Sequence, residues 1–230
     1  MEAYQKSFGD IQNELGVFNQ GLNKSQIDKY KHLFGKNEII EEKHESTLII
    51  FVNQFKDLLV IILIVAGIIS AISGEFESTI VILIVITLNA LLGTFQTVKA
   101  QKSIDSLKKL SIPKVKVIRE GKVQEINSNE LVVGDIVNIE AGDVIAGDGR
   151  LKEAVNLQIN ESALTGESNS VEKQLLPIDK KCTIGDMNNM VFSGSLVTNG
   201  TGQYIVTAVG MKSELGKIAG MLNETKQRKT

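Results

Sequence analysis

The residues best able to do chemistry lie in one polar loop, INESALTGESNSVEK, at positions 159–173. Within it, Thr165, Gly166, Glu167 and Ser168 place a carboxylate directly after a glycine and between two hydroxyls. Because glycine has no side chain to obstruct approach, such a carboxylate could enter a cleft of another domain. There it could orient a water molecule and accept its proton while a phosphoryl group is hydrolysed. An ordinary surface turn is the alternative interpretation of this tetrapeptide.

The composition excludes several other kinds of site. Cys182 is the single cysteine, so no internal disulfide can form, which fits a reducing compartment. His32 and His44 are isolated, and together with one cysteine they supply too few soft ligands for zinc. No Gly-rich phosphate loop, Ser/His/Asp set or metal-ligand cluster can be assembled from the sequence. The 25 basic and 27 acidic residues give a net charge of −2, so we expect no nucleic-acid partner.

Two uncharged, apolar runs in the first half of the chain predict a membrane hairpin. They extend from Leu58 to Gly74 and from Ser78 to Val98. At 1.5 Å per residue they reach roughly 25 and 31 Å, against a hydrocarbon core of about 30 Å. Residues 75–77 alone separate them, so the chain must turn straight back. We therefore predict a transmembrane hairpin over residues 46–98, with spans of about 57–74 and 78–98. A helical hairpin buried in a soluble protein is the alternative.

The lysines predict the orientation of this hairpin. The loop between the runs has none, whereas lysines flank the hairpin at Lys43, Lys56, Lys99, Lys102, Lys108 and Lys109. Positive charge favours the cytoplasmic side, so we expect an integral membrane protein of the plasma membrane with both termini cytoplasmic. Asn89 is unfavourable in hydrocarbon, and with small residues such as Gly67 and Gly93 it indicates packing against further helices.

Residues 1–45 are typical of short amphipathic helices. One of these is expected to have an N-cap at Ser25 and a stop at Gly35. The apolar stretch from Leu48 to Phe55 could lie along the membrane interface before the first span.

After the hairpin, residues 99–112 predict a helical linker that Pro113 ends. Residues 113–210 have the texture of an all-β domain, for which an antiparallel sandwich, barrel or jelly roll is expected. Residues 211–230 predict a second helical linker whose helix begins at Met211. The expected β elements are a hairpin turning at 120–122 and strands within 135–140, 155–159, 190–197 and 202–209.

The order of these features resembles the amino-terminal portion of a P-type cation-transporting ATPase. QFKDLLV (54–60) is similar to the entry of the first transmembrane helix in the calcium-pump branch. GDIVNIEAGDVIAGDGRL (134–151) and NESALTGES (160–168) are similar to signature segments of the actuator domain. Residues 189–218 resemble its closing strands and exit linker. The resemblance extends over the chain from about residue 22 onward.

This resemblance implies a fold and a mechanism that is divided between domains. Residues 113–210 would be the cytoplasmic actuator domain, a distorted jelly roll, next to the α-helical membrane hairpin and the short N-terminal helices. In the family, ATP with Mg²⁺ phosphorylates an aspartate in a DKTGT motif, and water later removes the phosphate. Glu167 would position that water, and Thr165, Gly166 and Ser168 would support the loop. Rotation of the actuator would pull on its two helical linkers and move the first transmembrane helices.

The sequence also departs from the family pattern. DKTGT, the nucleotide-binding domain and the later transmembrane helices are absent from these 230 residues. We therefore expect the chain alone to be inactive and to bind neither ATP, Mg²⁺ nor another metal. The missing domains, the transported cation and the lipid bilayer would be its partners. Ala146-Gly147-Asp148 stands where the family usually has Pro-Ala-Asp, and Thr97 follows Gln96 where Glu is common.

Three functions remain open at this point. The leading one is part of a cation pump, with calcium favoured by QFKDLLV, although sodium/potassium, proton and magnesium relatives share TGES. The second is a stand-alone, non-enzymatic β domain that is anchored in the membrane and acts as an adaptor or regulator. The third is a pore formed by association of hairpins, for which Asn89 and scattered Ser and Thr offer little polar lining.

Overall fold

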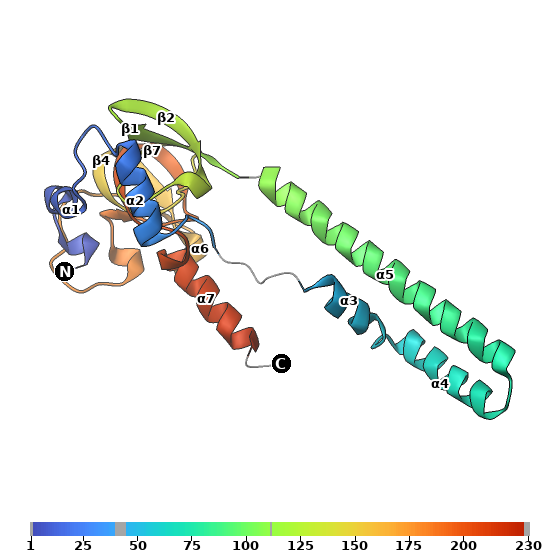
Figure 1. Ribbon diagram of the computed structural model, residues 1–230. Coiled ribbons are helices and arrows are strands. Elements are labelled where there is room, and N and C mark those ends of the chain that lie inside the picture. Colours follow the sequence, from blue (N-terminus) through green and yellow to red (C-terminus); the bar gives the residue numbers. More distant parts are fainter. Residues whose placement is uncertain (1, 40–44, 111, 228–230) are drawn as a thin grey trace. The chain divides into compact units, whose positions relative to one another are not determined.

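The computed structural model describes residues 2–39, 45–110 and 112–227 (Figure 1). The chain divides into two compact units. One, the β unit, combines Met1–Glu41 with Ile112–Thr230, and the other, the helical unit, is Glu42–Ser111. The end of the expected N-terminal segment, at 40–44, and the last three residues of the expected exit linker lie outside the described residues.

The β unit begins with three short helical elements: η1 (Ala3–Gln5), α1 (Phe8–Leu15) and α2 (Lys24–Phe34). The N-cap expected at Ser25 is wrong, because Asn23 caps α2 instead: its side chain accepts a hydrogen bond from the Gln26 amide, and the Gln26 side chain accepts one in return. The stop at Gly35 is confirmed, since this residue follows the helix with φ +88°.

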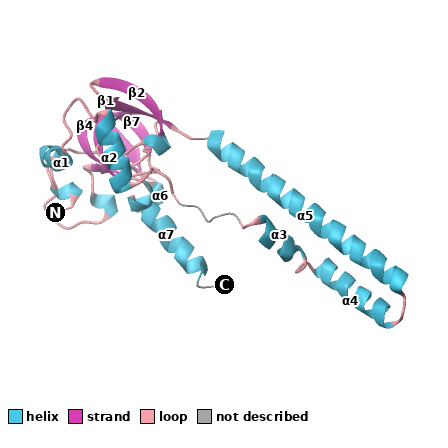
Figure 2. Ribbon diagram, viewed as in Figure 1, coloured by secondary structure: helices cyan, strands magenta, loops and turns pink. Residues whose placement is uncertain are grey.

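Seven strands form one antiparallel sheet in the order β2-β1-β3-β7-β4-β5, and β6 pairs with β4 (Figure 2). Their bounds are β1 (Lys114–Arg119), β2 (Lys122–Asn127), β3 (Ile136–Glu140), β4 (Asp148–Asn160), β5 (Ser170–Glu172), β6 (Met190–Val191) and β7 (Leu196–Ala208). The expected hairpin is confirmed: β1 and β2 pair around Glu120 and Gly121, both with positive φ. These pairings establish the antiparallel sheet, and the jelly-roll description stays a prediction.

Three stretches differ from expectation. The single strand expected at 190–197 is wrong, because β6 ends at Val191, the chain turns at Gly194 with φ +86°, and β7 begins at Leu196. β4 begins at Asp148, seven residues before the expected segment at 155–159. Its pairing with β7 contains several register shifts, so alternation of apolar and polar residues is interrupted along it. β5 was not expected from the sequence, because three exposed or half-buried residues carry no apolar pattern.

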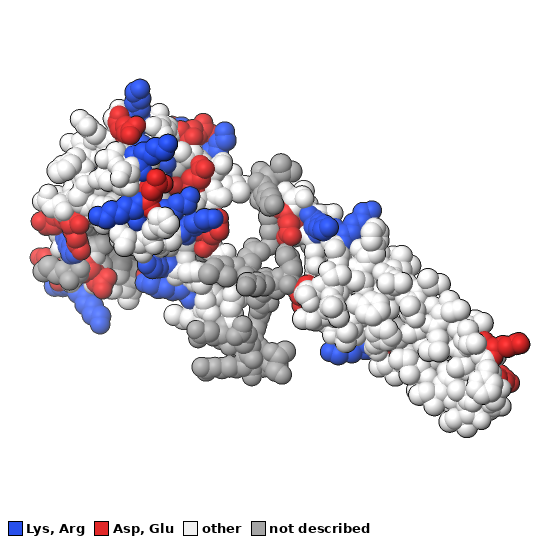
Figure 3. Space-filling model, in the orientation of Figure 1, with Lys and Arg blue, Asp and Glu red and all other residues white. Residues whose placement is uncertain are grey.

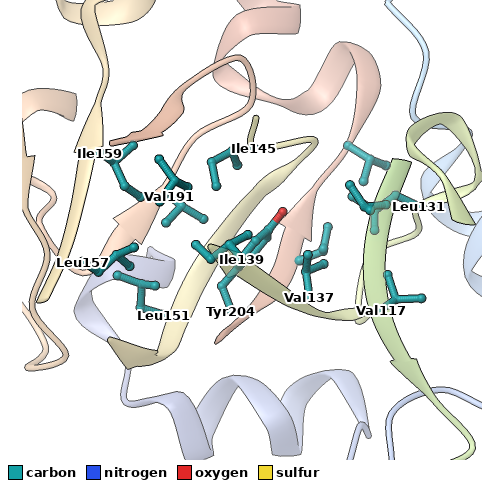
Figure 4. Packing of buried hydrophobic residues seen from close by; sticks show 14 of the residues in the cluster. Val117, Leu131, Val137, Ile139, Ile145, Leu151, Leu157, Ile159, Val191 and Tyr204 are labelled. Carbon is teal, nitrogen blue, oxygen red and sulfur yellow. The ribbon is translucent and has the colours of Figure 1, made fainter. Parts of the chain in front are cut away.

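The main core lies where β1, β3, β4, β6 and β7 bring their apolar side chains together (Figure 4). Tyr204 is fully buried within it. Gly149 on the neighbouring strand leaves room for this ring, since a Cβ at that position would lie 2.2 Å from Tyr204 Cδ2. The sheet is therefore closely packed where β4 begins beside β7.

Within the β unit, the N-terminal helices pack onto the sheet through a second apolar cluster. Ile11, Val17 and Leu22 are buried there against Ile136 and Ile205 of the sheet. Backbone contacts add to this packing, as the N–H of residue 120 donates to the Leu22 carbonyl. Residues far apart in the sequence thus share one compact unit, which the sequence pattern did not indicate.

The helical unit consists of α3 (Thr47–Gln54), α4 (Leu58–Ile72) and α5 (Phe76–Leu110). α5 is the one described helix that is long and apolar enough to cross a membrane by itself. α3 and α4 meet at an angle of 62°, and they meet the same criterion only when taken together as one bent span. The surface of this unit is largely uncharged along its length (Figure 3). That the two runs form a transmembrane hairpin stays a prediction.

Both helical linkers expected from the sequence are found in the described residues. α5 continues unbroken to Leu110, three residues before Pro113. The second linker forms η4 (Gly210–Lys212) and then α7 (Glu214–Gln227), so the start expected at Met211 is wrong. The physical reason is that the Ser213 hydroxyl accepts the Gly216 amide at 3.1 Å and so caps the helix three residues later.

Candidate functional site

The loop that carries the candidate residues connects β4 to β5 and contains the one-turn helix α6 (Ser162–Thr165). Asn160, the last residue of β4, shapes both sides of it. Its Oδ1 accepts the Ser162 amide at 3.0 Å, and its Nδ2 donates to the Ser168 carbonyl at 3.2 Å. The two halves of the loop are therefore held together immediately above the sheet.

Thr165, Gly166 and Glu167 form one hydrogen-bonded turn. The Thr165 hydroxyl donates to the Glu161 carbonyl at 3.1 Å and accepts the Glu167 amide at 3.2 Å. Gly166 has φ +77°, and its N–H donates to the Ser162 carbonyl at 2.9 Å, which ends the helix. Glu167 follows as an exposed residue. Its side chain is therefore open to solvent at the tip of the loop.

α6 is anchored to the rest of the β unit from below. Leu164 packs against a buried cluster of Tyr4, Met190 and Phe192, which joins the N-terminal segment to the strands. This packing fixes the backbone on the N-terminal side of Gly166 while the tip of the loop stays exposed.

Glu161 and Lys173 form a buried ion pair at the base of the loop. Lys173 Nζ lies 2.5 Å from Glu161 Oε1, and the two side chains are 0% and 1% exposed. Burial raises the pKa of the Glu161 carboxyl and lowers the pKa of the Lys173 ammonium, and their mutual attraction opposes both shifts. Removing either partner would leave a buried charge without compensation.

The exit linker follows β7 and is fixed to the same sheet by Asp148, the first residue of β4. The Asp148 carboxylate accepts the Ser193 amide at 2.8 Å and the Glu214 amide, the first of α7, at 2.7 Å. Burial raises the pKa of this carboxyl to about 6, although the two amide hydrogen bonds act in the opposite direction. Asp148 thus connects β4 directly to the first residue of α7.

Of the four residues expected at the site, three join in the turn described above, and Ser168 contributes its carbonyl to Asn160. Their catalytic roles stay predictions. Asn160, Glu161 and Lys173 were missed. The signal available was the placement of opposite charges at the two ends of the polar loop, flanking a segment that must fold back on itself. Among the described residues, no group of three or more His, Cys, Asp and Glu side chains could hold a metal ion.

Comparison with known proteins finds a matching family model for each half of the chain. Residues 109–223 match the family model of the P-type ATPase actuator domain, and residues 3–70 match that of the cation transporter/ATPase N-terminus. Over all 230 residues the chain is 40% identical to a calcium-transporting ATPase of Listeria monocytogenes and to calcium-transporting ATPase 1 of Lactococcus lactis. It is also 43% identical over 204 residues to a calcium-transporting ATPase of Bacillus subtilis. The chain covers 26%, 26% and 23% of these relatives, about a quarter of their length.

Proposed function

The chain belongs to the P-type ATPase family, and we propose that it is the amino-terminal part of an ATP-driven calcium pump in which Glu167 positions water for dephosphorylation. The observation that carries this proposal is the geometry of the loop. An exposed carboxylate stands at its tip, while the backbone on both sides is hydrogen-bonded to the side chain of Asn160, the last residue of β4. The names of the three relatives support calcium as the transported cation.

In this mechanism the residues of the chain act on an aspartyl-phosphate that another domain supplies. Glu167 would enter the cleft around the phosphate, orient the attacking water and accept its proton as the phosphoryl group leaves the aspartate. Thr165 holds the Glu167 amide, and Gly166 gives the backbone its reversal, so the carboxylate is positioned before the water arrives. ATP and Mg²⁺ would be used by the domains that carry the phosphorylated aspartate.

The remaining parts of the chain would convert this chemistry into movement. α5 passes without a break from its apolar stretch into the linker, and α7 starts on the Asp148 cap, so rotation of the β unit would be transmitted through stiff helices. We place the helical unit in a plasma membrane with the β unit cytoplasmic, as the lysine distribution favours. Asn89 is exposed on α5, which fits cover by further transmembrane helices of the pump.

The proposal is tested in the complete pump by replacing Glu167 with alanine. Phosphorylation by ATP should persist, because the phosphorylated aspartate lies elsewhere, whereas decay of the phosphoenzyme should slow by about a hundredfold or more. Acid-quenched labelling with radioactive ATP, followed by a chase, measures both quantities. Glu172→Gln is the matched control, since it removes an exposed carboxylate of the adjacent strand β5 and should decay like the wild type. Unchanged decay in Glu167→Ala would rule out the assigned role.

A further inference from the structure

The ion pair of Glu161 and Lys173 connects the start of the loop between β4 and β5 to the residue that follows β5. Glu161 directly follows β4, and Lys173 directly follows β5. The chain leaves the sheet after Asn160 and rejoins it at Ser170, so Glu161 begins the loop and Lys173 lies beyond the other end of the β4–β5 ladder. The pair therefore spans this ladder, and the tetrapeptide with Glu167 lies between its two members in the sequence. The last ladder pair, Asn160 with Ser170, lies beside it.

Each member of the pair is also fixed to the turn or to the sheet. The Glu161 carbonyl accepts the amides of Leu164 and Thr165 at 2.9 and 3.0 Å, and it accepts the Thr165 hydroxyl that holds Glu167. The Lys173 amide donates to the Leu157 carbonyl at 2.9 Å. A displacement of Glu161 would therefore move the Thr165 hydroxyl, which accepts the hydrogen bond of the Glu167 amide.

The contacts of the two side chains show that each compensates the buried charge of the other. Glu161 Oε2 is buried and has no hydrogen-bond partner among the described residues, so Lys173 is the main compensation for this carboxylate. On the other side, Lys173 Nζ lies 5.9 Å from the centre of the Phe192 ring, a cation–π contact. A buried carboxylate that loses its cation would be expected to move toward water.

We propose that Glu161 and Lys173 are positioning residues for dephosphorylation: their buried ion pair holds the base of the loop so that Glu167 reaches the phosphate in one fixed orientation. This inference rests on the proposed role of Glu167. It assigns no contact with the phosphate to either residue, and both act through the Thr165 hydroxyl and the backbone of α6.

The test is a double-mutant cycle on phosphoenzyme decay in the complete pump. The variants are Glu167→Gln, Lys173→Met and the two combined, with Lys122→Met as a control at an exposed lysine of the β1–β2 turn. Lys173→Met alone should slow decay about tenfold, while the amount of phosphoenzyme formed from ATP shows that the variant is folded. In the Glu167→Gln background the same change should slow decay less than twofold further, because it acts through Glu167. Lys122→Met should match the wild type.

The outcomes separate this inference from the proposed function. If Glu167→Gln slows decay but Lys173→Met does not, or if the two effects multiply in full, the inference is wrong and the role of Glu167 stands. If Glu167→Gln leaves decay unchanged, the proposed function itself fails. Should Lys173→Met yield no phosphoenzyme, Glu161→Gln replaces it in the cycle. That variant keeps an oxygen for Lys173 Nζ while removing the negative charge, and the same pattern is expected of it.

Discussion

Gly166 sets the direction in which the chain leaves α6 toward Glu167. Its φ of +77° lies in the left-handed region, which costs other L-residues roughly 1–2 kcal/mol. A Cβ at this position would meet no atom within 4 Å, so the requirement for glycine comes from the backbone and not from crowding. At the scale of the single residue, the orientation of the Glu167 carboxylate thus depends on a neighbour that has no side chain.

Replacement of Gly166 should therefore slow dephosphorylation by straining the turn. We expect Gly166→Ala to lengthen the lifetime of the phosphoenzyme about tenfold, and Gly166→Asn to have a smaller effect because asparagine tolerates the left-handed region. The measurement is the decay of labelled phosphoenzyme in the complete pump.

A matched control for backbone strain is Gly142→Ala. Gly142 has φ +99° in the turn after β3, and a Cβ there would also meet no atom within 4 Å. This variant should carry a similar strain and leave phosphoenzyme decay unchanged. An equal effect of the two alanine variants would show that the decay rate responds to general loss of stability and not to the orientation of Glu167.

At the scale of elements, the carboxylate that joins α7 to the sheet has a raised pKa. Asp148 caps the helix through the Glu214 amide, and burial places its pKa at about 6. Because the folded-state value lies above the ordinary value of 3.8, protonation favours the folded state. The stabilising contribution is complete below about pH 4 and is lost as the pH rises through about 6.

This predicts that the free energy of unfolding of the β unit contains a contribution from Asp148 that falls by about 2 kcal/mol between pH 4 and pH 7. Urea unfolding of the whole chain in detergent micelles can measure it by tyrosine fluorescence. All three tyrosines, at positions 4, 30 and 204, lie in the β unit, and the chain has no tryptophan. Asp148→Asn cannot titrate, so its unfolding free energy should change less with pH over this range. The same pH dependence in both proteins would contradict the assignment.

Some of these elements could be predicted from the sequence, and others could not. Local signals predicted the turn at Glu120 and Gly121, the stop at Gly35 and the helix up to Pro113, because each depends on the conformational limits of one or two residues. The start of β4 was missed because bulges interrupt its alternation. The packing of the N-terminal helices on the sheet was missed because it joins residues more than a hundred positions apart, such as Ile11 and Ile136.

The candidate site, too, could be predicted from the sequence only in part. The loop with Glu167 could be recognised because glycine, hydroxyls and a carboxylate are adjacent in the sequence. The ion pair of Glu161 and Lys173 could not, since its existence depends on β4 and β5 pairing and on the burial of both side chains. A charged residue in a polar loop is exposed by default, and only the fold shows that these two are not.

At the scale of the whole molecule, the chain combines an apolar helical unit with a β unit that presents an exposed carboxylate on a hydrogen-bonded loop. Neither unit contains an aspartate within a DKTGT motif, so the proposed activity requires the parts of the pump that make up the other three quarters of the relatives. We therefore predict that this sequence acts within a much larger polypeptide.

The measurement that tests this most directly uses native membranes and an antibody raised against residues 114–210. The membranes are incubated with radioactive ATP and calcium, quenched in acid, and the precipitated protein is separated by size. The account predicts a labelled band at about four times 25.1 kDa, with label that requires calcium and is released by hydroxylamine. A single unlabelled band at about 25 kDa would contradict it, and would instead favour a membrane-anchored β domain that acts without catalysis.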